Sequence, residues 1–261
     1  MRASVFWAIM LILIGGLLLL DNLGIIQADI WLLIGPLLLI GLGIWIIYGM
    51  AAHKNPPVEH RAVALDQASQ ARVRFRHGAG RLSVQSGTAP GNLVEGDFGG
   101  GVVVDSKSAK EQLEVTLSVP SQSFSWLWGP GASLDWEVRL ARDLPLELDF
   151  ETGAGENRLD LSDLLVTDLR FNSGASATEV TLPAAAGKSR AEFKTGVASL
   201  RVRLPQGVAA RIRTSGGLSN VSVDTNRFSR QGDGYQSIDF DSAENSADIQ
   251  IETGLGSVDI V

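Results

Sequence analysis

The amino-acid sequence predicts an N-terminal transmembrane α-helical hairpin followed by an all-β domain of stacked, solenoid-like repeats. Three observations support this prediction. Residues 1–50 hold two long apolar stretches without a charge. From Ala71 onward, apolar and polar residues alternate with the period of two that is typical of half-buried strands. A glycine-centred phrase then returns at intervals of 20–22 residues, which indicates a repeat architecture. We therefore expect a hairpin over 1–50, a linker over 51–70 and a repeat domain over 71–261.

Two segments, residues 3–20 and 30–50, are long enough to cross a bilayer as helices. At about 1.5 Å rise per residue they span roughly 27 and 31 Å, which matches the thickness of the hydrocarbon core. The connection Asp21–Asp29 contains the turn formers Asn22 and Gly24, so two antiparallel helices fit better than one long helix. A signal peptide is the competing interpretation of the first segment. No small-x-small cleavage site precedes Asp21, however, and a second apolar span follows at once.

Charges that flank the two spans predict their orientation. Arg2, Lys54 and Arg61 lie outside the spans, whereas the connecting loop carries only Asp21 and Asp29. The positive-inside rule then places both chain ends on the cytoplasmic side. We therefore expect a multi-pass membrane protein with a cytoplasmic β domain.

Small residues and one proline interrupt the second span. Pro36 frees a backbone carbonyl from its helical hydrogen bond, and a neighbouring helix must then satisfy that group. Gly35, Gly41 and Gly43 would let another backbone approach closely. No strict G-x-x-x-G motif occurs. These four residues are candidates for helix packing, and ordinary transmembrane composition explains them equally well.

Residues 51–70 (AAHKNPPVEHRAVALDQASQ) differ abruptly from the apolar segment before them. The Pro56-Pro57 pair enforces an extended, semi-rigid backbone, because neither proline can donate a hydrogen bond or continue a helix. We expect this linker to hold the following domain away from the membrane.

Glycine spacing predicts the architecture of the β domain. The interval is 21 residues from Gly153 to Gly174, 22 to Gly196, 20 to Gly216 and 38, nearly two units, to Gly254. One unit of strand, glycine turn and strand is too small to bury its own apolar face, so neighbouring units must stack into a continuous core. Glycine recurs because the turn needs a positive φ or a close approach between backbones.

The alternation also assigns side chains to the core or to solvent. The residues of opposite parity are mostly Glu, Asp and Arg, and we expect them to form exposed cross-strand charge pairs. The apolar residues that we expect in the core are Leu146, Leu148, Phe150, Leu159, Leu161, Leu169, Phe171, Val180, Leu182, Phe193, Leu200, Val202, Leu204, Ile212, Val221, Val223, Ile249, Ile251, Val258 and Ile260.

Residues 88–145 depart from the repeat and contain an aromatic cluster. Within the sequence SFSWLWGPG, the large residues Phe124, Trp126 and Trp128 alternate with smaller ones. Tryptophan suits a membrane interface or the centre of a protein contact, so these three residues are candidates for a partner or membrane contact. An aromatic cap over the open end of the solenoid is an equally strong interpretation.

Composition excludes several classes of function. The absence of cysteine removes disulfides, thiolate metal sites and thiol catalysis. A net charge of −7 without a basic stripe argues against nucleic-acid binding. Carboxylates such as Asp160 and Asp163 have no adjacent base or nucleophile. The phrase with Gly153, Gly155 and Asp160 departs from the spacing of calcium-binding β-rolls. We expect no catalytic residues, no metal and no cofactor.

Two stretches of the chain together resemble a known family. GGLLLLDNLGII (Gly15–Ile26), Trp31 and GPLLLIGLGIW (Gly35–Trp45) resemble the transmembrane segment of LiaI- and LiaF-type bacterial proteins. The stretch Asp135–Pro183 resembles the β domain of LiaF-like proteins, called a toast-rack domain. The resemblance implies a bacterial cell-envelope stress protein, also called a cell-wall-active antibiotic response protein, without catalytic residues. In the best-understood branch, such a protein restrains a partner sensor histidine kinase until envelope damage relieves the restraint.

Two hypotheses about function follow. The first is a non-enzymatic regulator or scaffold of the envelope-stress response in the bacterial cytoplasmic (inner) membrane. It would act through contacts with a membrane protein such as a sensor histidine kinase. The second is an extracytoplasmic, adhesin-like or envelope-binding β module. The side of the membrane on which Val261 lies separates the two, and a homo-oligomer is compatible with both.

Overall fold

The computed structural model describes residues 58–109, 111–120 and 134–261, together with seven isolated positions in the N-terminal segment. The chain divides into two units, and all described strands belong to the second. The isolated positions are helical except for Leu23, which lies in a turn. Within the described part of the chain, no helix is long and apolar enough to cross a membrane. The predicted spans 3–20 and 30–50 lie almost entirely outside the described residues.

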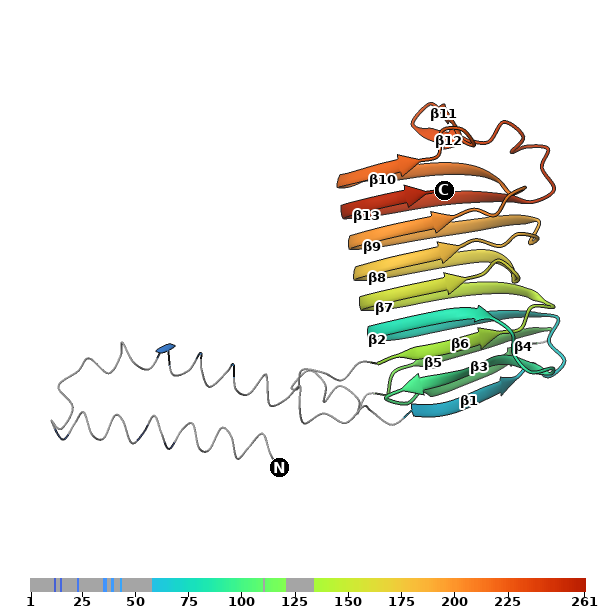
Figure 1. Cartoon of the computed structure of the whole chain (residues 1–261). Helices are drawn as coiled ribbons and strands as arrows, with labels where there is room; N and C mark the ends of the chain where they lie inside the picture. Colours follow the sequence, from blue (N-terminus) through green and yellow to red (C-terminus); the bar gives the residue numbers. More distant parts are fainter. Residues whose placement is uncertain are drawn as a thin grey trace. The chain divides into compact units, whose positions relative to one another are not determined.

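Thirteen described strands form the β domain, which confirms the predicted all-β class (Figure 1). They are β1 (Val58–Ala64), β2 (Gln70–Ser86), β3 (Asn92–Gly99), β4 (Val103–Ala109), β5 (Gln112–Ser118), β6 (Trp136–Leu140), β7 (Pro145–Asp160), β8 (Leu165–Thr181), β9 (Lys188–Arg203), β10 (Ala209–Val223), β11 (Ser229–Gln231), β12 (Gly234–Gln236) and β13 (Ser246–Ile260).

Six long strands build the body of the domain. They stack in the order β2, β7, β8, β9, β13 and β10, and each runs parallel to its neighbours. Each strand bends at a glycine near its middle, and we call the parts before and after the bend the first and the second arm. In β7, Leu146, Leu148 and Phe150 are buried in the first arm and Leu159 is buried in the second. The two arms therefore enclose one core between them.

The repeating unit differs from the predicted strand, turn and strand. Residues such as Gly153 lie inside one continuous strand and do not connect two paired strands. The reason is that each arm hydrogen-bonds to the same arm of the layers above and below, as the registers of β7 with β8 show. The glycines therefore mark a corner of the stack.

The layers do not follow chain order throughout, because β13 lies between β9 and β10. Without β13, Arg190 of β9 would lie beside Arg211 of β10. The register instead places Asp248 between them, and Asp248 accepts a hydrogen bond of 2.6 Å from Arg213. Opposite charges on neighbouring strands favour this order, since like charges placed directly opposite each other are destabilising.

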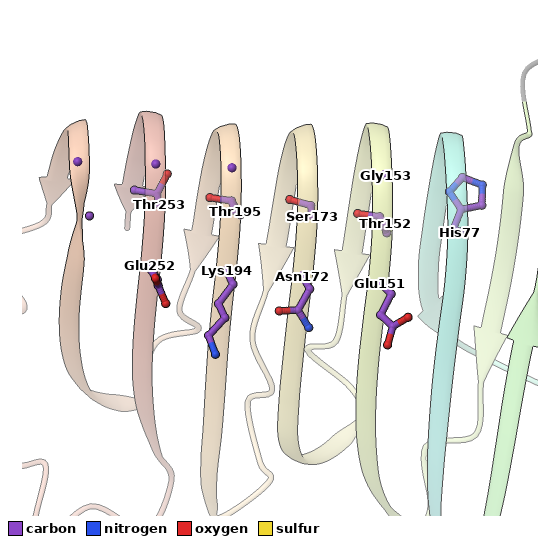
Figure 2. A pocket seen from close by; sticks show the side chains of 14 residues that line it. His77, Glu151, Thr152, Gly153, Asn172, Ser173, Lys194, Thr195, Glu252 and Thr253 are labelled. Atoms are coloured by element: carbon purple, nitrogen blue, oxygen red, sulfur yellow. The ribbon is translucent and has the colours of Figure 1, made fainter. Parts of the chain in front are cut away.

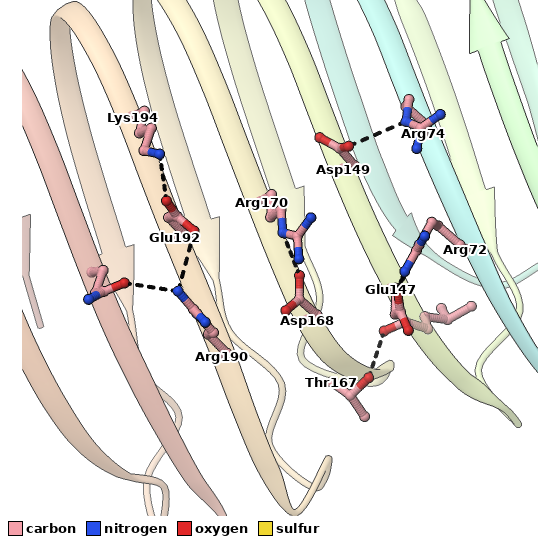
Figure 3. Close-up of polar contacts among 12 residues, drawn as sticks. Arg72, Arg74, Glu147, Asp149, Thr167, Asp168, Arg170, Arg190, Glu192 and Lys194 are labelled. Atoms are coloured by element: carbon pink, nitrogen blue, oxygen red, sulfur yellow. Dashed lines mark hydrogen bonds and ion pairs between the residues drawn. The ribbon is translucent and has the colours of Figure 1, made fainter.

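Charged side chains cross the layers in rows on the outer face of the first arms (Figure 3). Arg72 hydrogen-bonds to Glu147, and Arg74 donates to Asp149 at 3.3 Å. Each exposed pair contributes little to the stability, but together the pairs penalise a wrong neighbour. In one row, which consists of Arg72, Glu147, Asp168, Arg190, Asp248 and Arg211, every neighbouring pair is of opposite charge except Glu147 and Asp168.

Shorter strands flank both ends of the stack (Figure 1). At one end, the first arm of β2 pairs with β5, which pairs with β4, while the second arm is followed by β6, β3 and β1. At the other end, β12 and β11 cover β10 only over Arg211–Arg213. Residues 58–64, which we expected in the linker 51–70, form β1, because Val63 packs against the core and the segment pairs with β3.

The core is an in-register stack of apolar side chains. The rings of Phe75 and Phe150 are stacked with centroids 4.6 Å apart, and Phe171 and Phe193 continue the row at 6.0 and 6.2 Å. All of the predicted core residues are buried except two valines of β10, Val221 and Val223, which are only partly buried. These two belong to the last layer of the stack, where no described strand lies beyond the second arm.

Candidate functional site

A ladder of glycines lines the corner of the stack. The paired neighbours of these glycines place one in each of the six layers: Gly78, Gly153, Gly174, Gly196, Gly254 and Gly217. A Cβ atom built on any of the last four would lie 2.6–2.8 Å from the carbonyl oxygen of the glycine in the adjacent layer. Glycine is required because the backbones approach too closely for any side chain.

The missing side chains leave a shallow groove of about 690 Å³ across the layers (Figure 2). Two rows of side chains accompany the glycine ladder. The first row precedes each glycine directly and consists of Thr152, Ser173, Thr195 and Thr253. The second row forms the rim and consists of Glu151, Asn172, Lys194 and Glu252. The groove is therefore a consequence of the close packing at the corner.

The first row places hydroxyl groups beneath the groove. Thr195 and Thr253 are 6% and 3% exposed, and their hydroxyl oxygens, like that of Thr152, have no hydrogen-bond partner among the described residues. Ser173 differs, because its hydroxyl lies 2.9 Å from that of Ser176. Buried hydroxyls without partners cost stability, so the corner is polar at some energetic expense.

Ion pairs fix the charges along the rim. Lys194 lies 2.8 Å from Glu192, and this hydrogen bond lowers the pKa of Glu192 and raises the pKa of Lys194. Glu151 lies 3.3 Å from Arg76. The rim therefore carries both signs of charge at neutral pH. Exposed backbone beside fixed charges suits contact with an extended segment of another protein.

His77 ends the row of hydroxyl residues at the β2 layer. Its side chain is buried, its Nε2 donates to the carbonyl oxygen of Leu134 at 2.7 Å, and its ring centroid lies 5.0 Å from that of Trp136. Burial lowers the pKa of His77, although the contact with Leu134 and the charge of Asp135 oppose the shift. Burial therefore favours the neutral imidazole, and its hydrogen bond ties β2 to the backbone at Leu134.

We expect the free energy of unfolding to fall as the pH drops below the usual His pKa of about 6.5. Because the pKa of His77 is lower in the folded chain, the unfolded chain binds more protons below that pH. The stabilisation is therefore complete above it and is lost below it, at no more than about 1.4 kcal/mol per pH unit. Pulse proteolysis in urea at about pH 7.5 and about pH 5.5 measures the loss. The His77→Gln variant removes this titration, so a variant that loses as much stability as the native chain would contradict the prediction.

The site residues predicted from the sequence are described only in part. The aromatic residues Phe124, Trp126 and Trp128, and also Gly41, lie outside the described residues. Gly35 and Pro36 are helical and exposed, and Gly43 is helical and half-buried. A Cβ atom built on Gly35 or Gly43 meets nothing within 4 Å, so helix packing at these positions stays a prediction.

Both carboxylates that the sequence analysis considered for catalysis accept hydrogen bonds from serine. Asp160 accepts one of 2.7 Å from Ser162, and Asp163 accepts one of 3.4 Å from Ser86. In the part of the chain that the structure describes, no group of three or more His, Asp or Glu side chains is arranged to hold a metal ion. The groove itself escaped the sequence analysis, although Thr or Ser before the repeated glycine is a signal that could have found it.

The sequence matches two protein families, in the order expected. Residues 52–203 match the N-terminal domain of toast_rack, DUF2154, and residues 5–47 match the LiaI-LiaF-like transmembrane region. The chain belongs to the toast-rack family. The second match identifies this toast-rack protein as membrane-anchored and LiaF-like. The number of spans and the side of the β domain stay predictions.

One solved structure shares the fold of the β domain. A candidate cell adhesion protein from Clostridium sporogenes aligns with a TM-score of 0.70 and 21% identity, over 78% of this chain and 98% of the other. A candidate adhesin from Bacteroides fragilis aligns with a TM-score of 0.25 and 7% identity, over 78% and 97% of the two chains. No curated protein matches the chain. Toast-rack domains are a non-enzymatic kind of domain.

Proposed function

We propose that this protein is a non-enzymatic regulator or scaffold of the bacterial envelope-stress response, acting through protein contacts at the membrane. The observation that carries the proposal is the groove along the glycine ladder, which crosses all six long layers of a membrane-anchored toast-rack chain. The partner that we propose is a membrane protein, a sensor histidine kinase in the first instance.

The chemistry of the groove supports a contact role over a catalytic one. Its floor is glycine backbone. Its rim carries, in the order of the layers, Glu151, the uncharged Asn172, Lys194 and Glu252. An extended segment of a partner can lie along such a strip, because the glycine floor allows close approach and the charged rim gives specificity. The buried Thr hydroxyls form no hydrogen bond to a base among the described residues. The Nε2 of His77, which lies beside Thr152, is already bonded to the Leu134 carbonyl oxygen, so the row is unsuited to nucleophilic catalysis.

An envelope-stress reporter in the native bacterial host tests the proposal. We expect deletion of the chain to raise the basal reporter signal, and additional deletion of the sensor kinase to abolish that rise. Lys194→Glu reverses a charge on the groove rim and should reproduce the deletion. Lys107→Glu makes the same change on β4 and should behave like the native chain, since both lysines are exposed. An unchanged basal reporter signal after deletion of the chain would refute the regulatory function. A rise in the signal that persists without the kinase would refute it as well.

The orientation of the β domain separates this function from an envelope-binding one. We propose a cytoplasmic β domain, on the strength of the charges that flank the two apolar stretches. Of two reporter enzymes fused after Val261, one active only in the cytoplasm and one active only outside it, we therefore expect activity from the cytoplasmic one alone. Activity on the other side would favour the adhesin-like function, with which the shared fold of the Clostridium sporogenes protein is compatible.

A further inference from the structure

We propose that a second copy of this chain binds along the open edge of β10, antiparallel to residues 218–223. This edge is the second arm of the last layer in the stack. Its inner side pairs with β13 from Leu218 to Val223, and no described strand pairs with its outer side. Alternate backbone N–H and C=O groups of an edge strand point outward, and such a row is a template for a further strand.

The open edge differs from the other sheet edges in its charge. The described arms end in four edges, and three of them carry charged side chains that oppose strand addition: β4 with Asp105 and Lys107, β1 with Glu59 and Arg61, and β11 with Arg230. The remaining edge reads LSNVSV and has neither a charge nor a proline. Charges and prolines are the usual means of blocking an edge, so this edge alone is left available.

One row of charges across the second arms ends at the same place. It runs Arg158, Glu179, Arg201 and Asp259, and the next residue in register is Ser222. On the first arm, the corresponding row ends in Arg211, where β12 covers the strand. In this row of the second arms, the charges continue as far as β13 and stop at the open strand.

A second copy is the occupant that fits an uncharged edge. In an antiparallel pair about a two-fold axis, each side chain faces one from the same strand of the partner. A charge close to the axis would then lie near the same charge of the partner, and none is present on this edge. The partly buried Val221 and Val223 of both copies would continue the apolar core across the interface. The anchor adds to this by confining copies to the membrane plane, which raises their effective concentration.

Cysteine cross-linking tests the pairing on a clean background, because the chain has no cysteine. Asn220→Cys and Ser222→Cys place exposed thiols on the open edge, and Ser106→Cys places one on the charged edge of β4. The full-length variants are treated in membranes with a short bis-maleimide. We expect cross-linked dimers of the chain from at least one of the first two variants and only monomer from the control. Equal dimer from the control, no dimer from either open-edge variant, or a product containing another protein would overturn the proposal.

A charge placed on the edge provides the second measurement. Asn220→Lys puts like charges close together across the two-fold axis and should weaken self-association at least about tenfold. Light scattering of the full-length protein in detergent reports the oligomeric state, and pulse proteolysis shows that the variant is folded. Ser106→Lys, on β4, is the matched control. A folded Asn220→Lys variant that self-associates like the control would also overturn the proposal, whatever the kinase dependence of the stress reporter.

Discussion

Replacing Gly155 by alanine is expected to destabilise the β domain by at least about 3 kcal/mol. Gly155 has a φ of +146°, which L side chains rarely adopt. Its Cβ atom would fall on the carbonyl oxygen of Gly80, well inside contact distance. Neither backbone can move away, since both strands are held in register by their neighbours. Strain and overlap therefore act together at this corner.

Urea denaturation followed by pulse proteolysis of the full-length protein measures this effect. Gly78→Ala is the matched control, because Gly78 stands in the glycine ladder but a Cβ atom there meets nothing within 4 Å. We expect the control to change the free energy of unfolding by less than about 1 kcal/mol. Equal losses in the two variants would show that close approach of backbones is not what selects glycine at the corner.

Replacing Phe171 by alanine is expected to cost about 3–5 kcal/mol. Phe171 is fully buried and packs between Phe150 and Phe193, so its loss opens a cavity in the middle of the aromatic row. The flanking strands are fixed by the registers of β8 on both sides, and the cavity cannot collapse easily.

The same denaturation measurement applies to Phe171→Ala, with Ile238→Ala as its control. Ile238 is 95% exposed, so its truncation should change the stability by no more than about 0.5 kcal/mol. A loss below about 1.5 kcal/mol for Phe171→Ala would mean that the layers can close around a missing ring.

Local pattern predicted the core well, because inward and outward positions of a strand depend only on a period of two. Leu146, Leu148 and Phe150 are buried as expected, and so are Ile249 and Ile251 of the last repeat. The change of parity between the arms was also visible, since Leu159 follows Phe150 at an odd interval. Periodicity does not show whether glycine joins two strands or bends one, and that distinction depends on the neighbouring layers.

Features that depend on distant partners escaped prediction. The place of β13 follows from the alignment of Asp248 with Arg190 and Arg211, which come from two other repeats. The groove follows from contacts such as the one between Gly196 and the Gly174 carbonyl, which join different layers. The strand β1 was mistaken for linker because its alternation is short and charged, as suits an edge strand. Sequence spacing records none of these partners.

The insertion of β13 has a consequence for how the domain is made. β10 leaves the ribosome before β13, yet β13 is the layer between β9 and β10. Each paired residue of β13 has a partner in β9 that lies 58 positions earlier in the chain and a partner in β10 that lies 37 positions earlier. The layers up to β9 can assemble during synthesis, because each adds to a finished neighbour. β10 has no correct place until β13 has emerged. During synthesis, β10 must therefore remain outside the stack until β13 has paired with β9, so the last strand to be made is not the last layer of the stack.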